Sequence, residues 1–195
     1  MEYLPIHFLQ LPNLLFDIFA PMKTTLLFFA SFFFALTGMS QSSTKTISLF
    51  ENKLKIDIPA DVHEMNEATV KLKYHKSKDG KTFFYADDDA SFSFAVSTIA
   101  EKVKETDMVK HKDEFTAKLG SGGFKPESNE VKIVNGHSLL VIAFYSEVPG
   151  GKVYNKKVFG VTSGKLFMIA FNCTEGQLAK RLPEIESAIN SIHVK

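Results

Sequence analysis

Two six-residue segments are apolar at every position, and they constrain the fold more than any other feature of the sequence. They are Leu139–Phe144 and Leu166–Phe171. Short apolar runs bounded by turn residues are typical of strands. Because successive side chains of a strand point to opposite faces, strands that are apolar on both faces belong to a sheet that is covered on both sides. The sequence therefore predicts a sheet between two layers.

Glycine-containing turns divide the C-terminal half of the chain into four β segments. The segments are Val131–Val134, Ser138–Tyr145, Val153–Val161 and Leu166–Cys173, and the turns contain Asn135-Gly136, Pro149-Gly150 and Ser163-Gly164. Asn-Gly is a strong hairpin signal because both residues accept a positive φ. We expect these four strands to form an antiparallel meander.

The N-terminal half carries shorter β signals. Two runs, Ile47–Phe50 and Leu54–Ile58, flank a short polar turn and predict a hairpin that ends at Pro59. Three further runs also have the composition of strands, with Lys78-Asp79-Gly80 as the turn between the first two. These runs are Val70–Tyr74, Thr82–Ala86 and Phe92–Ile99.

Two amphipathic helices are expected to cover the sheet. Thr106 or Asp107 caps the first helix, which ends at Gly120 and has an apolar side made of Met108, Val109, Phe115 and Leu119. Thr174-Glu175-Gly176-Gln177 matches a capping box and opens the second. Its apolar stripe is Leu178, Leu182, Ile185, Ile189 and Ile192. Pro183 falls within the stripe and predicts a kink or a restart.

Together these elements predict an α+β fold. It is an α-β-α sandwich with a central antiparallel, meander-rich sheet of about 6 to 8 strands and two main flanking helices.

The first 40 residues have the features of a targeting leader. Residues 22–40 predict a signal peptide, with Lys23 at its start, an apolar run over Leu26–Leu36 and cleavage before Gln41. The alternative is a membrane anchor, but a spanning helix needs about 20 apolar residues. Residues 1–21 lack the expected basic character and are interpreted as a mis-called N-terminal extension, and residues 41–195 as a single globular domain. We expect an exported protein, periplasmic or extracellular, that meets the membrane only through its signal peptide before cleavage.

The charge balance argues against nucleic acid as a partner. The whole chain has 23 basic and 22 acidic side chains, and removing residues 1–40, which hold Lys23, Glu2 and Asp17, leaves 22 and 20. Both signs alternate along the chain, so no basic stripe is present to bind a phosphate backbone. Cys173 is the single cysteine, which excludes an intrachain disulfide.

Few residues suggest chemistry, and no catalytic or cofactor-binding motif is recognised. Asp87, Asp88 and Asp89 are the weak candidates for a metal site, because carboxylates bind calcium. Adjacent positions of an extended chain point in opposite directions, however, and a calcium loop places its ligands at alternate positions. A solvated strand end is the preferred interpretation of this cluster.

The remaining polar candidates are isolated. The histidines of the domain are His63, His75, His111, His137 and His193, none of them spaced as a helical zinc pair. Ser138 follows His137 but lacks the strained turn of a nucleophile elbow. Cys173 ends an apolar strand, which favours a small buried side chain over an activated thiolate.

The order of elements resembles the PsbP-like fold family, which includes PsbP and the DcrB-type envelope proteins. The resemblance rests on the opening Leu54–Pro59, the strands between Val131 and Cys173, and the closing Ile185–Ile192. It covers nearly all of residues 45–193. It implies an α-β-α sandwich and a non-enzymatic accessory or binding domain, and carries no functional residue over to this chain.

The leading hypothesis is an exported, non-enzymatic accessory or binding protein that has no cofactor and binds a protein or small ligand in the cell envelope. The alternative is a small-ligand or lipid carrier, or a hydrolase whose site is assembled from distant residues. An apolar cleft of roughly several hundred Å³ between sheet and helix would favour a carrier. A flat polar surface would favour contact with a protein.

Overall fold

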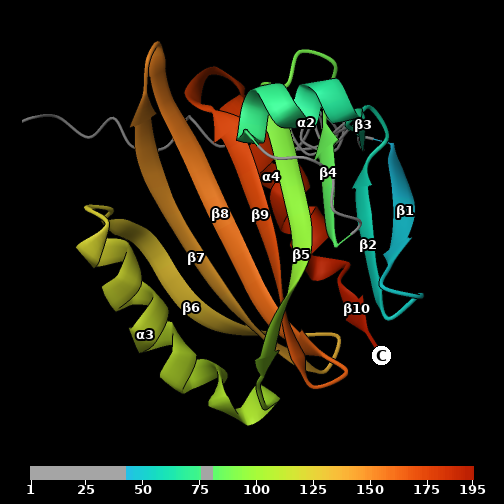
Figure 1. Cartoon of the computed structure of the whole chain (residues 1–195), viewed down its shortest axis with the longest axis vertical. Coiled ribbons are helices and arrows are strands. Elements are labelled where there is room, and N and C mark those ends of the chain that lie inside the picture. The colour runs from blue at the N-terminus through green and yellow to red at the C-terminus, as the bar shows by residue number, and fades with distance from the viewer. Residues whose placement is uncertain (1–42, 76–80) are drawn as a thin grey trace, which may run out of the picture. The chain divides into compact units, whose positions relative to one another are not determined.

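The computed structural model describes residues 43–75 and 81–195 (Figure 1). Its main feature is a seven-stranded antiparallel sheet with the strand order β3-β4-β5-β9-β8-β7-β6. The strands are β3 (His63–Glu64), β4 (Thr82–Ala86), β5 (Phe92–Lys102), β6 (Pro126–Val134), β7 (His137–Val148), β8 (Gly151–Thr162) and β9 (Lys165–Thr174). The predicted meander of the last four strands is confirmed, and each of them is longer than its apolar run.

The turns of the meander form where the sequence predicts them. Asn135 and Gly136 adopt φ values of 48° and 85°, as a two-residue hairpin with positive φ at both positions requires. The register places Leu140 opposite Phe159 and Phe159 opposite Met168. This row of apolar side chains crosses three strands on one face of the sheet.

A separate three-stranded sheet contains the predicted N-terminal hairpin. β1 (Thr44–Leu49) pairs with β2 (Leu54–Pro59), and β10 (His193–Val194) adds to the other edge of β2. Leu54, Ile56 and Ile58 of β2 are fully buried. The hairpin thus supplies apolar side chains to the core, and the two termini of the described domain meet in this sheet.

The prediction of a strand over Val70–Tyr74 is wrong, because these residues belong to helix α2 (Glu67–Tyr74). Asn66 caps the helix, and its side-chain oxygen accepts a hydrogen bond of 2.9 Å from the Thr69 N–H. Only Val70 of the helix is buried. Because only one residue of this segment is buried, packing does not demand that apolar and polar side chains alternate as in a strand. The Asn66 cap therefore favours the helical conformation. The predicted turn at Lys78–Gly80 lies outside the described residues, as do the interpretations of residues 1–40.

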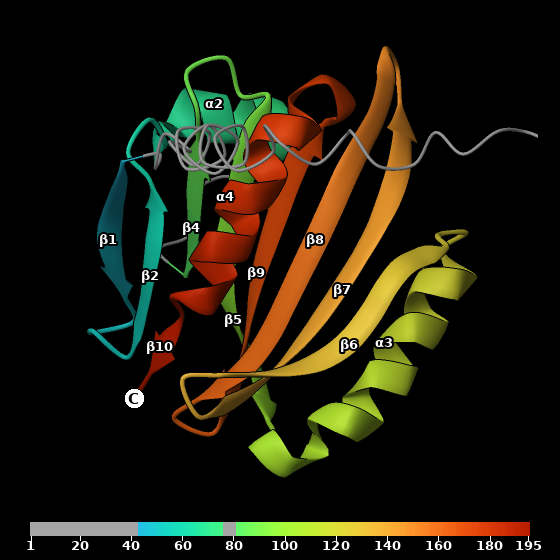
Figure 2. The same ribbon diagram turned by 180° about the vertical axis from the view of Figure 1, so that it is seen from behind.

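Helix α4 (Leu178–Asn190) and the three-stranded sheet cover one face of the large sheet (Figure 2). Ile185 and Ile189 of the predicted stripe are fully buried there. The predicted capping box is wrong: a 3-10 turn, η2 (Glu175–Gln177), precedes the helix, and the Thr174 side chain makes no capping hydrogen bond. α4 also runs through Pro183 without a restart, because proline removes only one intrahelical hydrogen bond.

Helices α2 and α3 lie against the opposite face. The 3-10 turn η1 (Glu105–Asp107) leads into α3 (Met108–Ser121), which packs on β6 and β7. Asp107 is at the predicted cap position but makes no side-chain capping bond. Val70 of α2 packs with Phe84 of β4. The α-β-α arrangement is confirmed, with a second small sheet beside α4.

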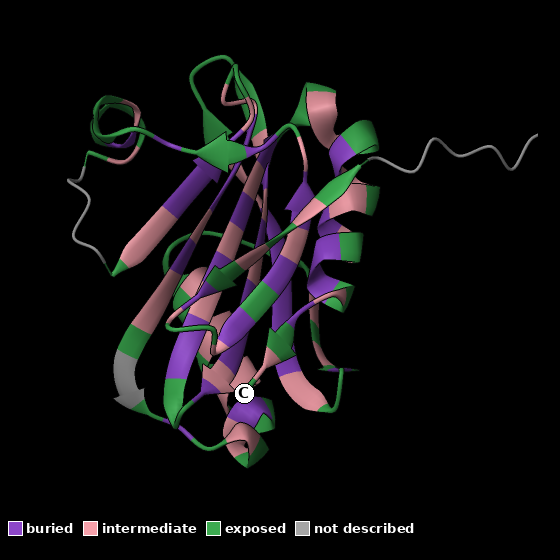
Figure 3. Cartoon of the chain, turned by 90° about the vertical axis from the view of Figure 1, so that its right-hand side faces the viewer, coloured by how far each residue is buried: buried purple, intermediate pink, exposed green. Residues whose placement is uncertain are grey.

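Burial follows this layering. Every residue from Leu139 to Phe144 is at most 4% exposed, as expected for a strand covered on both faces. Figure 3 shows buried residues concentrated along the strands of the sheet. Within the described ranges, no helix is both long and apolar enough to span a bilayer.

Candidate functional site

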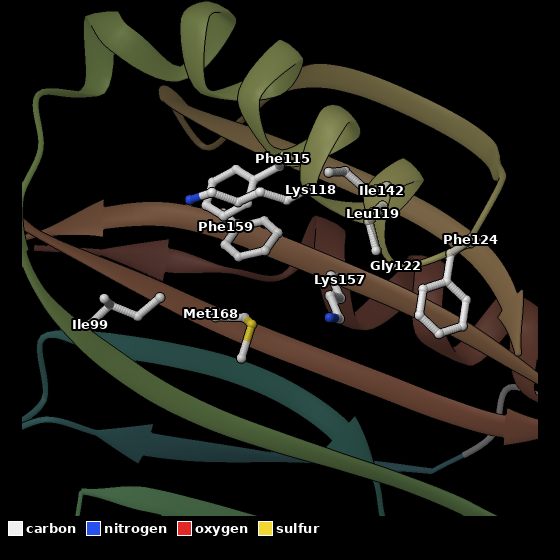
Figure 4. A pocket seen from close by; sticks show the side chains of 10 residues that line it. All are labelled: Ile99, Phe115, Lys118, Leu119, Gly122, Phe124, Ile142, Lys157, Phe159 and Met168. Atoms are coloured by element: carbon white, nitrogen blue, oxygen red, sulfur yellow. The ribbon is translucent and has the colours of Figure 1, made fainter.

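A groove lies between α3 and the large sheet, on the face opposite α4 (Figure 4). Its volume is about 320 Å³. Side chains from α3, the loop after it and four strands line the groove: Ile99, Phe115, Lys118, Leu119, Gly122, Phe124, Ile142, Lys157, Phe159 and Met168. Apolar residues dominate this lining, and the two polar side chains are both lysines.

The helical wall of the groove comes from one side of α3. Phe115 and Leu119 are four residues apart and therefore lie on the same side of the helix. The Phe115 ring stacks on Phe159 of β8 with ring centroids 4.2 Å apart. Offset ring stacking of this kind fixes the distance between helix and strand.

The loop after α3 closes one end of the wall. The Phe124 ring packs against Phe144 at 5.1 Å between centroids. A Cβ at Gly122 would lie 3.3 Å from both the Leu119 carbonyl oxygen and the Phe124 ring. Glycine at this position therefore allows Phe124 to fold back over the groove.

The floor is a part of the pleated surface of the sheet. Ile142, Phe159 and Met168 come from β7, β8 and β9, and their side chains point to the same face. Ile142 is fully buried, whereas Met168 is only partly buried. Ile99 of β5 and Phe124 remain 36% and 37% exposed. Apolar surface is thus left open to solvent along the groove.

Lys157 is the polar group of the floor. It lies opposite Ile142 in β7 and Ala170 in β9. Its Nζ is 5.4 Å from the centre of the Phe144 ring, and burial lowers the pKa of the ammonium group. Lys118 on α3 is exposed, with its Nζ 5.5 Å from the centre of the Phe115 ring. The lining of the groove is therefore apolar apart from two lysine side chains.

The acidic cluster at residues 87–89 does not act as one unit. Asp87 turns inward, with its side chain 8% exposed, and accepts hydrogen bonds from the Phe92 N–H, the Ser91 hydroxyl and Arg181. Asp88 and Asp89 are exposed, and the hydrogen bond from the Ser91 N–H lowers the pKa of Asp89. The interpretation as a solvated strand end is therefore wrong for Asp87. Within residues 43–75 and 81–195, no group of three or more His, Cys, Asp or Glu side chains is placed to hold a metal ion.

Arg181 explains the position of Asp87. Its guanidinium, 3% exposed, donates hydrogen bonds of 2.8 to 3.2 Å to Asp61, Asp87 and Glu184, and lies 5.1 Å from the Phe92 ring centre. These carboxylates outweigh the effect of burial and raise the pKa of Arg181, while the same hydrogen bonding lowers that of Asp61. The cluster joins α4 to the loops after β2 and β4. Sequence reasoning missed it, although Arg181 falls on the apolar stripe, three residues after Leu178 and four before Ile185.

The histidines lie on separate elements. His111 and Glu114 form a pair at 3.0 Å on α3, and His137 at the start of β7 lies 3.3 Å from Glu105 of η1. Glu105 also accepts a hydrogen bond from the backbone N–H of Ser138. Glu105 therefore joins the turn before α3 to the start of β7. Neighbouring side chains on a strand point to opposite faces, so His137 does not activate Ser138.

Cys173 is fully buried, as its place at the end of an apolar strand predicts. Burial raises the pKa of its thiol to about 11, so the thiolate is scarce at neutral pH. The histidines, Ser138 and Cys173 are all absent from the lining of the α3 groove.

Comparison with solved structures identifies the fold as PsbP-like. The solution structure of cyanobacterial PsbP (CyanoP) from Synechocystis sp. PCC 6803 aligns with a TM-score of 0.57 and 14% identity, covering 81% of this chain and 96% of that chain. A crystal structure from Bacteroides thetaiotaomicron VPI-5482 aligns with a TM-score of 0.54 and 14% identity, covering 77% of this chain and 48% of that chain. No family model and no curated protein matches the sequence.

Proposed function

We propose that this protein is an exported, non-enzymatic binding protein that carries a small, largely apolar ligand in the α3 groove. The observation that carries this proposal is the concave, open apolar surface between α3 and the sheet. Its volume of about 320 Å³ is at the lower end of the range for ligand pockets, roughly 300 to 1,000 Å³. The ligand is therefore a small molecule or a single chain of a lipid.

The hydrophobic effect favours a ligand that covers the apolar surface of the groove. Ile99 and Phe124 are more than a third exposed, although they lie beside a buried core, and Met168 is also accessible. A ligand that covers this surface gains roughly 25 cal/mol for each Å² of apolar area removed from water. Isolated exposed apolar residues are ordinary, whereas apolar residues gathered around a concave surface are typical of ligand-binding grooves.

The rival functions fit the groove less well. A flat polar surface would favour contact with a protein, whereas this surface is hollow and apolar. A hydrolase needs a nucleophile or a general base. The described side chains that line the groove include no serine, threonine, cysteine, histidine, aspartate or glutamate. Export is supported by the signal-peptide pattern at residues 22–40, and a mature N-terminus at Gln41 in purified protein would test it.

Native mass spectrometry of the purified protein tests for a retained ligand, and displacement of the neutral dye Nile red tests the site. We expect Ile99→Trp, which fills the groove, to weaken dye binding about tenfold or more. Ile133→Trp is the matched control, because Ile133 is 70% exposed on β6 and is not part of the lining. Equal dye binding by the two variants, at wild-type strength, would refute the groove as the site.

A further inference from the structure

Lys156 and Lys157 are neighbours on β8, and they point to opposite faces of the sheet. The Lys156 side chain is 6% exposed on the face covered by α4, and its Nζ donates a hydrogen bond to the Glu186 carboxylate. Lys157 points into the α3 groove. Of two neighbouring lysines on β8, Lys156 is thus buried against a carboxylate, whereas Lys157 faces the groove.

The environment of Lys157 leaves its charge uncompensated. Among the described residues, its one interaction is with the face of the Phe144 ring, and no carboxylate forms an ion pair with it. Other lysines of the domain, one exposed and one partly buried, do have oxygen partners. Lys73 donates a hydrogen bond of 2.6 Å to the Ala90 carbonyl oxygen, and Lys132 lies 3.2 Å from Glu130. A desolvated ammonium group without a counter-ion is unfavourable, so an anion bound here would be stabilised.

The groove surrounds this cation with apolar surface. Figure 4 shows Lys157 between Phe124 on one side and Phe159 and Met168 on the other. Lys118, on the helical wall, adds a second positive charge near the surface. The complementary molecule has one anionic group at the level of Lys157 and an apolar chain beside it.

We propose that the ligand of the α3 groove is an anionic amphiphile, an acyl chain whose carboxylate or phosphate head group pairs with Lys157. The head group accepts hydrogen bonds from the Nζ, and the chain packs on Phe115, Phe159 and Met168. This assignment rests on the proposed function, since it names the chemical class of ligand for the same groove.

The test measures how well three compounds with the same 12-carbon chain displace Nile red from the purified protein. They are dodecanoate, dodecyl phosphate and the neutral dodecanol, each kept below its micelle or solubility limit. A hydrogen bond to a charged group contributes enough to change affinity about tenfold or more. We expect at least one of the two anions to bind that much more tightly than dodecanol, and the preferred anion identifies the head group.

Variants of β8 localise the effect. Lys157→Met should abolish the preference for the anion and leave dodecanol binding unchanged or slightly tighter, whereas Lys157→Arg should retain the preference. Lys152→Met is the matched control, because Lys152 is an exposed lysine on the same strand and is not part of the lining. Thermal unfolding of each variant verifies that the fold persists.

The outcomes separate this inference from the proposed function. If dodecanol binds as tightly as both anions, or if Lys157→Met keeps the preference, the ligand class is wrong and the groove remains an apolar binding site. If none of the three compounds displaces the dye and Nile red itself does not bind, the proposed function fails together with the inference.

Discussion

The two faces of the seven-stranded sheet differ in whether their buried and partly buried charges have a partner of opposite charge. On the face covered by α4, Arg181 has three carboxylate partners and Lys156 has one. On the face covered by α2 and α3, the ammonium group of Lys157 has an aromatic ring but no carboxylate as its partner among the described residues. Charge on the first face is neutralised within the protein, while charge on the second is available to a ligand.

This difference indicates separate roles for the faces. A buried cluster of paired charges holds its elements in one arrangement, and removing one partner leaves uncompensated charge. A partly desolvated cation beside open apolar surface lowers stability, and proteins retain such features at functional sites. Substitutions on the face covered by α4 should therefore reduce the stability of the protein. Substitutions in the groove, on the face covered by α2 and α3, should change ligand binding.

The largest expected effect is that of Arg181→Met, which leaves Asp61, Asp87 and Glu184 without their shared cation. Breaking a buried ion pair costs about 3 to 5 kcal/mol of the free energy of unfolding. Urea denaturation followed by circular dichroism measures it. Lys180→Met is the control, because Lys180 is 58% exposed and 3.6 Å from Asp61, and it should cost less than about 1 kcal/mol. Similar losses in the two variants would show that the α4 face does not depend on this cluster.

An intermediate effect is expected for Gly160→Ala, which tests packing on the α4 face. A Cβ at Gly160 would lie 2.5 Å from the Phe167 ring and 2.6 Å from Leu139. Overpacking of a close-packed core costs about 1 to 3 kcal/mol. Gly176→Ala is the control, since a Cβ there meets no atom within 4 Å. Denaturation midpoints of the two variants are compared, and a Gly160→Ala protein as stable as wild type would mean that this face is loosely packed.

The smallest effect, and one of opposite sign, is expected for Lys157→Met. Because burial lowers the folded-state pKa of Lys157, its charged form opposes folding at neutral pH, and this cost disappears as pH rises from the folded pKa through the ordinary value of 10.5. The variant should be more stable than wild type by up to about 1 kcal/mol at pH 7. The difference should shrink towards pH 10.5. A clear loss of stability at pH 7 would contradict the assignment of Lys157 to binding.

Much of the site could be predicted as separate pieces. Phe115 and Leu119 lie on a predicted helix, and Ile142, Phe159 and Met168 on predicted strands. That these five residues line one groove could not be predicted, because the spacing of residues along the sequence does not tell where α3 crosses the sheet. The strand predicted at Val70–Tyr74 was wrong for a local reason, since the cap at Asn66 carried more information than the β-type composition. The Arg181 cluster joins residues up to 120 positions apart, and no local pattern marks such a set.

The sequence by itself determined the strands of the meander and the need for a layer on each face of the sheet. These follow from the alternation of side chains along a strand, which is a local property of the chain. Only the tertiary structure decided that one layer would close over its face and the other would leave a groove beside Lys157. The hydrophobic effect is not directional, so it requires apolar surface to be covered, but the packing of particular side chains determines how completely.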